Sequence, residues 1–134
     1  MNLFFYAPLM DKQGKELYQK IGGLCFNTGL ELHCSLGSLS KRLCQPIKDF
    51  SIAILYLAKK ENLLEILSIR DLLFGIRIIL VLPNRETDTI SKAHILGPTL
   101  LDYSDSDFTE VGAVLNKMLS HEFYPYQQLG EGRG

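Results

Sequence analysis

Apolar residues run almost without interruption through residues 50–58 (FSIAILYLA), between Pro46 and the charged residues 59–61. Strict alternation would indicate a strand with one solvent-exposed face, whereas a continuous run indicates a strand covered on both faces. Residues 76–82 (IRIILVL) have the same character, and residues 3–6 (LFFY) are a shorter version. The pattern therefore predicts three buried strands in a parallel sheet.

Segments with helical spacing separate the buried strands. The first helix is predicted over residues 12–21, with Asp11 as its N-cap and two glycines as its end, because glycine accepts the left-handed conformation that follows a helix. Ser38 is expected to cap the second helix. The other helices are predicted over residues 62–74 and 87–96, and from the capping-box pair Asp107 and Glu110 to residue 119.

Five strands alternate with these helices. The buried ones are predicted over residues 2–7, 50–57 and 76–82, an edge strand with alternating polarity over residues 30–34, and a fifth strand over residues 99–103. Short connections and right-handed crossovers then predict a parallel sheet with helices on both faces. The expected fold is a five-stranded doubly wound parallel sheet of order 2-1-3-4-5, a three-layer flavodoxin-like α/β architecture.

Length and composition fit one domain. A chain of 134 residues can bury a core between a sheet and two layers of helices, and its apolar share of 46% is ordinary for a soluble globular protein. The composition departs from this only after Ser120. We therefore expect an α/β domain over residues 1–120 and a tail over residues 121–134 that is partly aromatic, then glycine-rich and mobile.

Charge and cysteine content limit the partners and the cellular compartment that we expect for this chain. A net charge of −1, with Lys and Arg scattered in doublets, gives no basis for binding nucleic acid or an acidic membrane surface. No apolar run is long enough to cross a bilayer, and the first residues lack the basic region and cleavage site of a signal peptide. Three cysteines without a disulfide framework favour a reducing compartment, so a cytoplasmic location is predicted.

Ligands of open α/β sheets bind beyond the carboxyl ends of the strands. Those ends are mostly neutral here, and Asp105 is the one obvious carboxylate among them. Because Mg²⁺ needs several converging oxygens, no metal site is predicted. The turn after the first strand is not glycine-rich, and Gly14-Lys15 lacks the rest of a P-loop, so no nucleotide or flavin cofactor is predicted.

The cysteines and histidines give no stronger site. Cys25, Cys34 and Cys44 show neither C-x-x-C spacing nor a paired histidine motif, although His33 adjoins Cys34. Such cysteines are expected to be small buried hydrophobes. A thiol at Cys34 that reacts is the open alternative.

Length, alternation and segment spacing resemble the receiver domain of bacterial response regulators, over roughly residues 2–119. Residues 52–55 (IAIL) followed by residues 62–67 (NLLEIL) resemble the central strand and following helix of that family. Residues 99–119 resemble its fifth strand and final helix. The resemblance implies a receiver-like α/β domain over residues 1–120.

The phosphorylation residues of that family are not carried over. By this resemblance, the acidic pair falls on Ala7 and Pro8, and the aspartate that accepts the phosphoryl group falls on Tyr56. The hydroxyl residue falls on Leu82 or Pro83, and the lysine falls on Ser104 or Ser106. A tyrosine phenol without Mg²⁺ and lysine does not reproduce acyl-phosphate chemistry. The resemblance therefore implies a degenerate receiver that is not an enzyme.

The remaining candidate is a surface that a partner protein could contact. Receivers communicate through their fourth helix, fifth strand and fifth helix, so by resemblance another protein, or a second copy of this chain, would contact the five residues Ile90, Ala93, His94, Leu101 and Tyr103. Leu101 or Tyr103 would occupy the family's switch-aromatic position. Ordinary core and edge packing explains the same residues equally well.

Three functions are compatible with the sequence. The leading hypothesis is a non-catalytic signalling or regulatory domain that acts through protein contacts, without aspartyl phosphorylation. The second is a small-ligand-binding or enzymatic flavodoxin-like domain, with a pocket around Tyr6, Pro8, Tyr56 and Tyr103. The third is a divergent partner within a larger assembly whose function lies elsewhere.

Overall fold

The computed structural model of the chain describes residues 1–25 and 29–123, the last three by their backbone only. The mobile tail predicted over residues 121–134 therefore lies outside the described residues, apart from the end of the last helix. That helix continues to Phe123, three residues beyond the predicted domain boundary.

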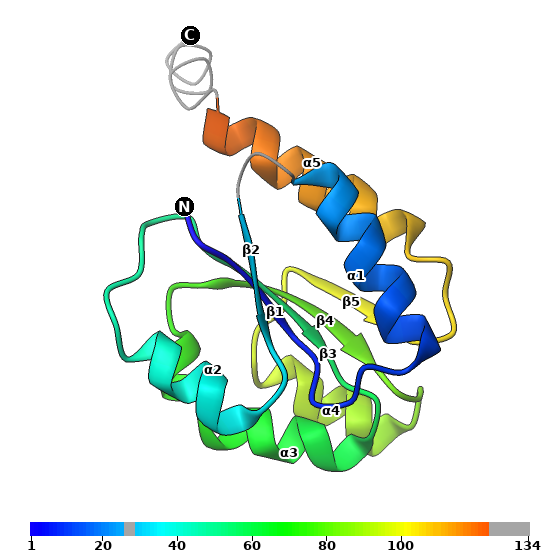
Figure 1. The fold of residues 1–134 in the computed structure, drawn as a ribbon. Coiled ribbons are helices and arrows are strands. Elements are labelled where there is room, and N and C mark those ends of the chain that lie inside the picture. The colour runs from blue at the N-terminus through cyan, green and yellow to red at the C-terminus, as the bar shows by residue number, and fades with distance from the viewer. Residues whose placement is uncertain (26–28, 124–134) are drawn as a thin grey trace, which may run out of the picture.

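The predicted alternation of strands and helices is confirmed. The elements in chain order are β1 (Leu3–Tyr6), α1 (Lys12–Leu24), β2 (Leu30–His33), α2 (Leu36–Leu43), β3 (Ile52–Tyr56), α3 (Lys60–Ser68), the short 3-10 helix η1 (Arg70–Leu73), β4 (Arg77–Leu82), α4 (Thr87–His94), β5 (Leu100–Tyr103) and α5 (Thr109–Phe123). All strand pairs are parallel, in the predicted order β2-β1-β3-β4-β5. Figure 1 shows this three-layer, flavodoxin-like arrangement.

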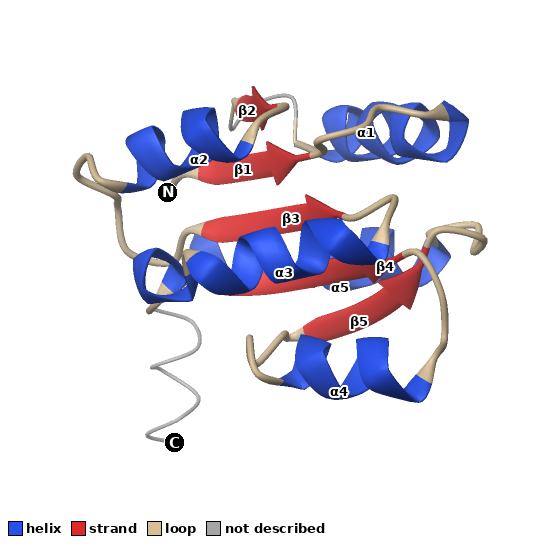
Figure 2. Ribbon diagram, turned by 90° about the horizontal axis from the view of Figure 1, so that it is seen from below, coloured by secondary structure: helices blue, strands red, loops and turns tan. Residues whose placement is uncertain are grey.

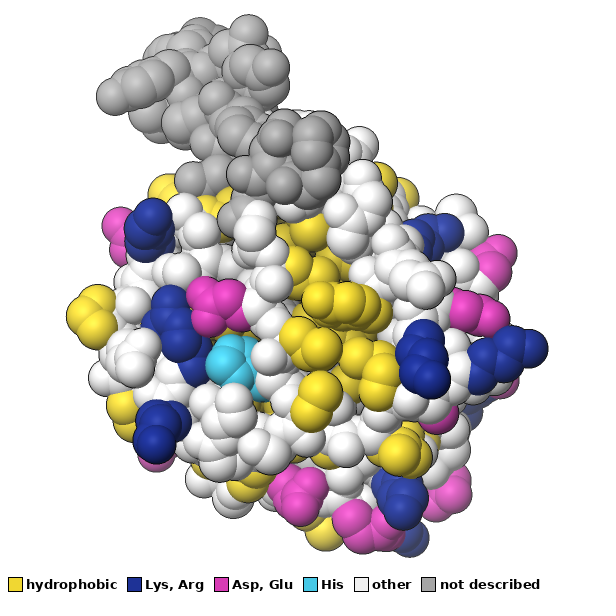
Figure 3. All heavy atoms as spheres, viewed as in Figure 1, with side chains coloured by type: hydrophobic (Ala, Val, Ile, Leu, Met, Phe, Trp, Pro, Cys, Tyr) yellow, Lys and Arg dark blue, Asp and Glu magenta, His cyan; other side chains and the backbone are white. Residues whose placement is uncertain are grey.

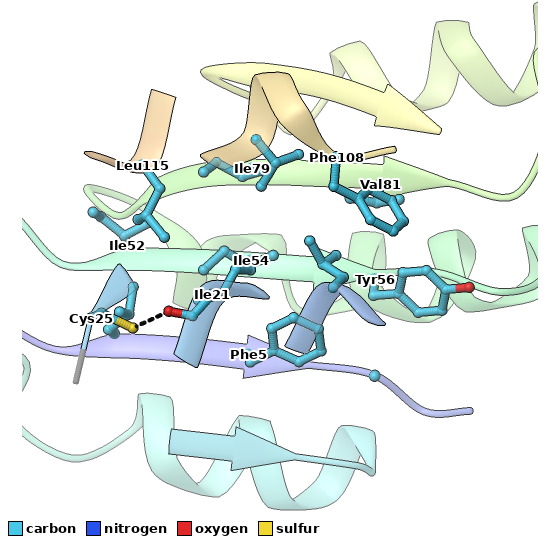
Figure 4. Packing of buried hydrophobic residues seen from close by; sticks show 14 of the residues in the cluster. Phe5, Ile21, Cys25, Ile52, Ile54, Tyr56, Ile79, Val81, Phe108 and Leu115 are labelled. Carbon is cyan, nitrogen blue, oxygen red and sulfur yellow. Dashed lines mark hydrogen bonds between the residues drawn. The ribbon is translucent and has the colours of Figure 1, made fainter. Parts of the chain in front are cut away.

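Two separate cores lie on the two faces of the sheet. α1 and α5 cover one face, and α2, α3 and α4 cover the other, as Figures 1 and 2 show from two directions. Along β3, Ile52, Ile54 and Tyr56 belong to the first core, while Ala53 and Leu55 belong to the second. Figure 4 shows the first core from close by. The continuous apolar run at residues 52–56 is thus explained by burial on both faces.

Two helix ends differ from the prediction. Asp11 does cap α1, since its side chain accepts a hydrogen bond from the Gly14 amide at 2.9 Å. The helix nevertheless continues through Gly22 and Gly23 to Leu24, because both glycines keep helical backbone angles. Ser35, and not Ser38, caps α2, because the Ser35 hydroxyl accepts from the Ser38 amide.

The helix predicted over residues 62–74 is broken. α3 begins earlier, at Lys60, and ends at Ser68, and η1 follows it through i→i+3 hydrogen bonds such as Leu72 N to Ile69 O at 2.9 Å. Ile69, between α3 and η1, leaves the helical region with φ −114° and ψ 20°. A β-branched residue is a weaker helix former and is tolerated at such a break.

The central strand is shorter than predicted at its start. Phe50 lies outside β3, is 56% exposed and has φ of 64°, which is unusual for a bulky residue. Apolar character placed it in the strand, but Ser51 is held by the preceding loop through a hydrogen bond from its hydroxyl to the Lys48 carbonyl. The loop therefore turns Phe50 away from the core.

The capping box predicted for the last helix, between Asp107 and Glu110, does not form. α5 begins at Thr109, two residues after Asp107. The Asp107 carboxylate instead accepts a hydrogen bond from the Thr109 amide at 3.0 Å, and Phe108 is turned into the core with φ of 62°. Glu110 therefore falls in the first turn and not three residues into the helix.

We predict that Ile54→Ala lowers the free energy of unfolding by about 3 kcal/mol, because the removed atoms come from a fully buried side chain at the centre of the first core. The matched control is Leu64→Ala on the exposed side of α3, which should change it by less than about 0.5 kcal/mol. Urea unfolding at neutral pH measures both. Equal losses in the two variants would contradict the assignment of the core.

Candidate functional site

The positions that the receiver resemblance singled out lie along one edge of the sheet. Ala7 and Pro8 follow β1, Tyr56 ends β3, and Leu82 ends β4. Pro83 follows β4, and Ser104 and Ser106 follow β5. Because the carboxyl ends of parallel strands share an edge, the topology brings these positions together as predicted. We call this the carboxyl edge.

A hydrogen bond between Tyr56 and Asp11 joins the end of β3 to the loop that follows β1. The Tyr56 hydroxyl donates a 2.6 Å hydrogen bond to Asp11 Oδ1, the same oxygen that accepts from the Gly14 amide. Tyr56 is fully buried, and its hydroxyl lies at the end of the core (Figure 4). Burial and, after it, the Asp11 carboxylate raise the pKa of Tyr56 well above that of an ordinary tyrosine. The phenol is thereby kept neutral and fixed to the first loop.

Gly14 makes room for this contact. A Cβ added at Gly14 would come within 3.1 Å of Tyr56 Cε2 and 3.3 Å of Asp11 Oδ1. Both neighbours are held by their mutual hydrogen bond, so neither can move away freely. The Gly14-Lys15 pair that lacks the rest of a P-loop is therefore explained by close packing of α1 on the end of β3.

Tyr6 ends β1 and belongs to the other core. Its side chain is fully buried, and its hydroxyl has no hydrogen-bond partner among the described residues. Burial, with a smaller contribution from Glu65, raises the pKa of Tyr6 to about 12. Tyr6 and Tyr56 are registered on neighbouring strands, one residue apart, but only Tyr56 is bonded.

An ion pair occupies the β4–β5 side of the carboxyl edge. Arg85 binds Asp105 through two hydrogen bonds, of 2.8 and 2.9 Å, and its guanidinium lies 4.2 Å from the centroid of the Tyr103 ring. The hydrogen bonds from Arg85 hold the pKa of the Asp105 carboxyl below its usual range. Asp105, the carboxylate that the sequence placed at this edge, is therefore already paired.

Ser104 and Ser106, the two alternative equivalents of the family's lysine, both form hydrogen bonds in the loop between β5 and α5. Ser104 donates its amide to the Leu82 carbonyl at 2.9 Å, which extends the β4–β5 pairing. The Ser106 hydroxyl donates to Asp102 at 2.9 Å and accepts from the Phe108 amide. These bonds order the loop before α5 without placing a positive charge at the edge.

The carboxylates of this edge do not converge. Asp11 bonds Tyr56, Asp102 bonds Ser106, and Asp105 bonds Arg85, each in its own direction. Within residues 1–25 and 29–123, no group of three or more His, Cys, Asp or Glu side chains is placed to hold a metal ion. On the face drawn in Figure 3, basic and acidic side chains are interspersed, with no single-sign patch. The edge therefore offers hydrogen-bonded packing and no assembled set of charges.

The predicted partner face is only partly at the surface. Ala93 is fully buried and belongs to the second core, so a partner would not touch it directly. Ile90, Leu101 and Tyr103 are half-buried, and His94 is exposed. Ordinary core packing therefore explains Ala93, whereas the side chain of His94 is exposed to solvent.

The cysteines and Asp11 show what the residue pattern missed. Cys25 is buried, and its thiol donates to the Ile21 carbonyl, but Cys34 and Cys44 are exposed, contrary to the expectation of burial. Asp11 was assigned only as a helix cap, yet it also holds Tyr56. The available signal was its position just after the first strand, where α1 and the end of β3 meet.

Comparison of the chain with protein-family models, curated proteins and solved structures finds no match. In the described part of the chain, no helix has both the length and the apolar character needed to span a membrane.

We predict that Tyr56→Phe lowers the free energy of unfolding at neutral pH by about 1–2 kcal/mol, because it removes a short hydrogen bond to a carboxylate. Tyr6→Phe is the matched control, since it removes a buried hydroxyl that has no partner among the described residues; it should leave stability unchanged or raise it. Urea unfolding measures both. An equal loss from the two substitutions would contradict the assigned roles.

We also predict a fall in stability in alkaline solution. Above a pH of about 10 the tyrosines of the unfolded chain lose their protons. The folded chain retains these protons at Tyr6 and Tyr56, whose pKa values are raised, so the unfolded state gains relative stability as the pH rises toward about 12. The free energy of unfolding, measured at pH steps from 8 to 11, should fall less steeply in the Tyr6→Phe, Tyr56→Phe double variant. Identical slopes would show that other groups dominate.

Proposed function

We propose that this chain is a non-catalytic, receiver-like regulatory domain that acts through contacts with another protein and is not phosphorylated on aspartate. The observation that carries the proposal is the Tyr56–Asp11 hydrogen bond at the end of the central strand. It fixes a neutral, fully buried phenol where the resemblance would require an exposed carboxylate. A buried phenol that is already hydrogen-bonded favours a structural role at this position over reversible modification.

The chemistry of phosphoryl transfer supports the same proposal. Transfer to a carboxylate requires a nearby cation to neutralise the phosphoryl oxygens and an accessible acceptor. Ala7 and Pro8 offer no metal ligand, and Arg85, the cation on the other side of the edge, is already committed to Asp105 and the Tyr103 ring. The edge is therefore better suited to stabilising the fold than to exchanging a phosphoryl group.

The small-ligand alternative gains no support from the tyrosines on which it depended. Tyr6 and Tyr56 are fully buried in opposite cores, so their rings do not face one open pocket. Tyr103 is covered on one side by Arg85. Protein contact through the α4–β5 side, where His94 is exposed and the ring of Tyr103 is half-buried, is the reading that we favour.

Incubation with acetyl phosphate and Mg²⁺ tests the first half of the proposal. We expect the intact mass of the folded protein to stay unchanged, because no acceptor carboxylate lies beside a metal site at the carboxyl edge. An acid-stable, hydroxylamine-sensitive phosphoryl adduct, with the mass increase mapped to an aspartate, would contradict it.

A face-specific binding assay tests the second half. Proteins captured from lysate by the wild-type chain should be lost with His94→Glu, which places a charge at the exposed part of the α4–β5 side. Gln13→Glu on α1, exposed on the opposite face of the sheet, makes the same change of charge and should capture the same proteins. Loss in both variants, or in neither, would contradict a partner face at α4 and β5.

A further inference from the structure

We draw no further inference here: the strongest candidate, the surface patch of exposed apolar side chains at Phe50, Phe74 and Ile95 on the loops that precede β3, β4 and β5, carries none because nothing in the described part of the chain shows what covers it.

Discussion

Burial of the central strands on both faces is the constraint on which this structure depends. β1, β3 and β4 are covered by α1 and α5 on one side and by α2, α3 and α4 on the other. Apart from the exposed Arg77 at the start of β4, their side chains alternate between the two cores. Because neither face of these strands reaches solvent, a ligand could approach the sheet itself only at the ends of the strands. A partner protein could instead contact the outer helices, as proposed for α4.

The two edges are built in opposite ways. At the carboxyl edge, polar groups are paired internally: Tyr56 with Asp11, Arg85 with Asp105, and Ser106 with Asp102. In each pair the two side chains already hydrogen-bond to one another. At the opposite edge, where the strands begin, Phe74 and Phe50 are exposed on the loops that precede β4 and β3.

The fold could be predicted because each buried strand is continuous in the sequence and each helix has its own period. Strand order and layers followed from these patterns and from the handedness of crossovers. What the pattern could not give depends on contacts distant in sequence: Asp11 meets Tyr56 across 45 residues, and Gly14 is needed because Tyr56 packs against it. Phe50 was placed in the strand because apolar character does not reveal the direction in which a loop turns a side chain. The helix break at Ile69 was missed for a similar reason, since the apolar spacing of residues 62–74 continues across it.

We expect the carboxyl edge to take up neither a phosphoryl group nor a cation, because its polar side chains are paired by internal hydrogen bonds. Titration of the folded protein with Mg²⁺ and beryllium fluoride, a phosphoryl analogue, followed through backbone amide NMR shifts, measures this uptake. The amides of Ala7, Tyr56 and Ser104, three positions along this edge, should show no saturable shift. Saturable shifts that cluster at these three positions would contradict this expectation.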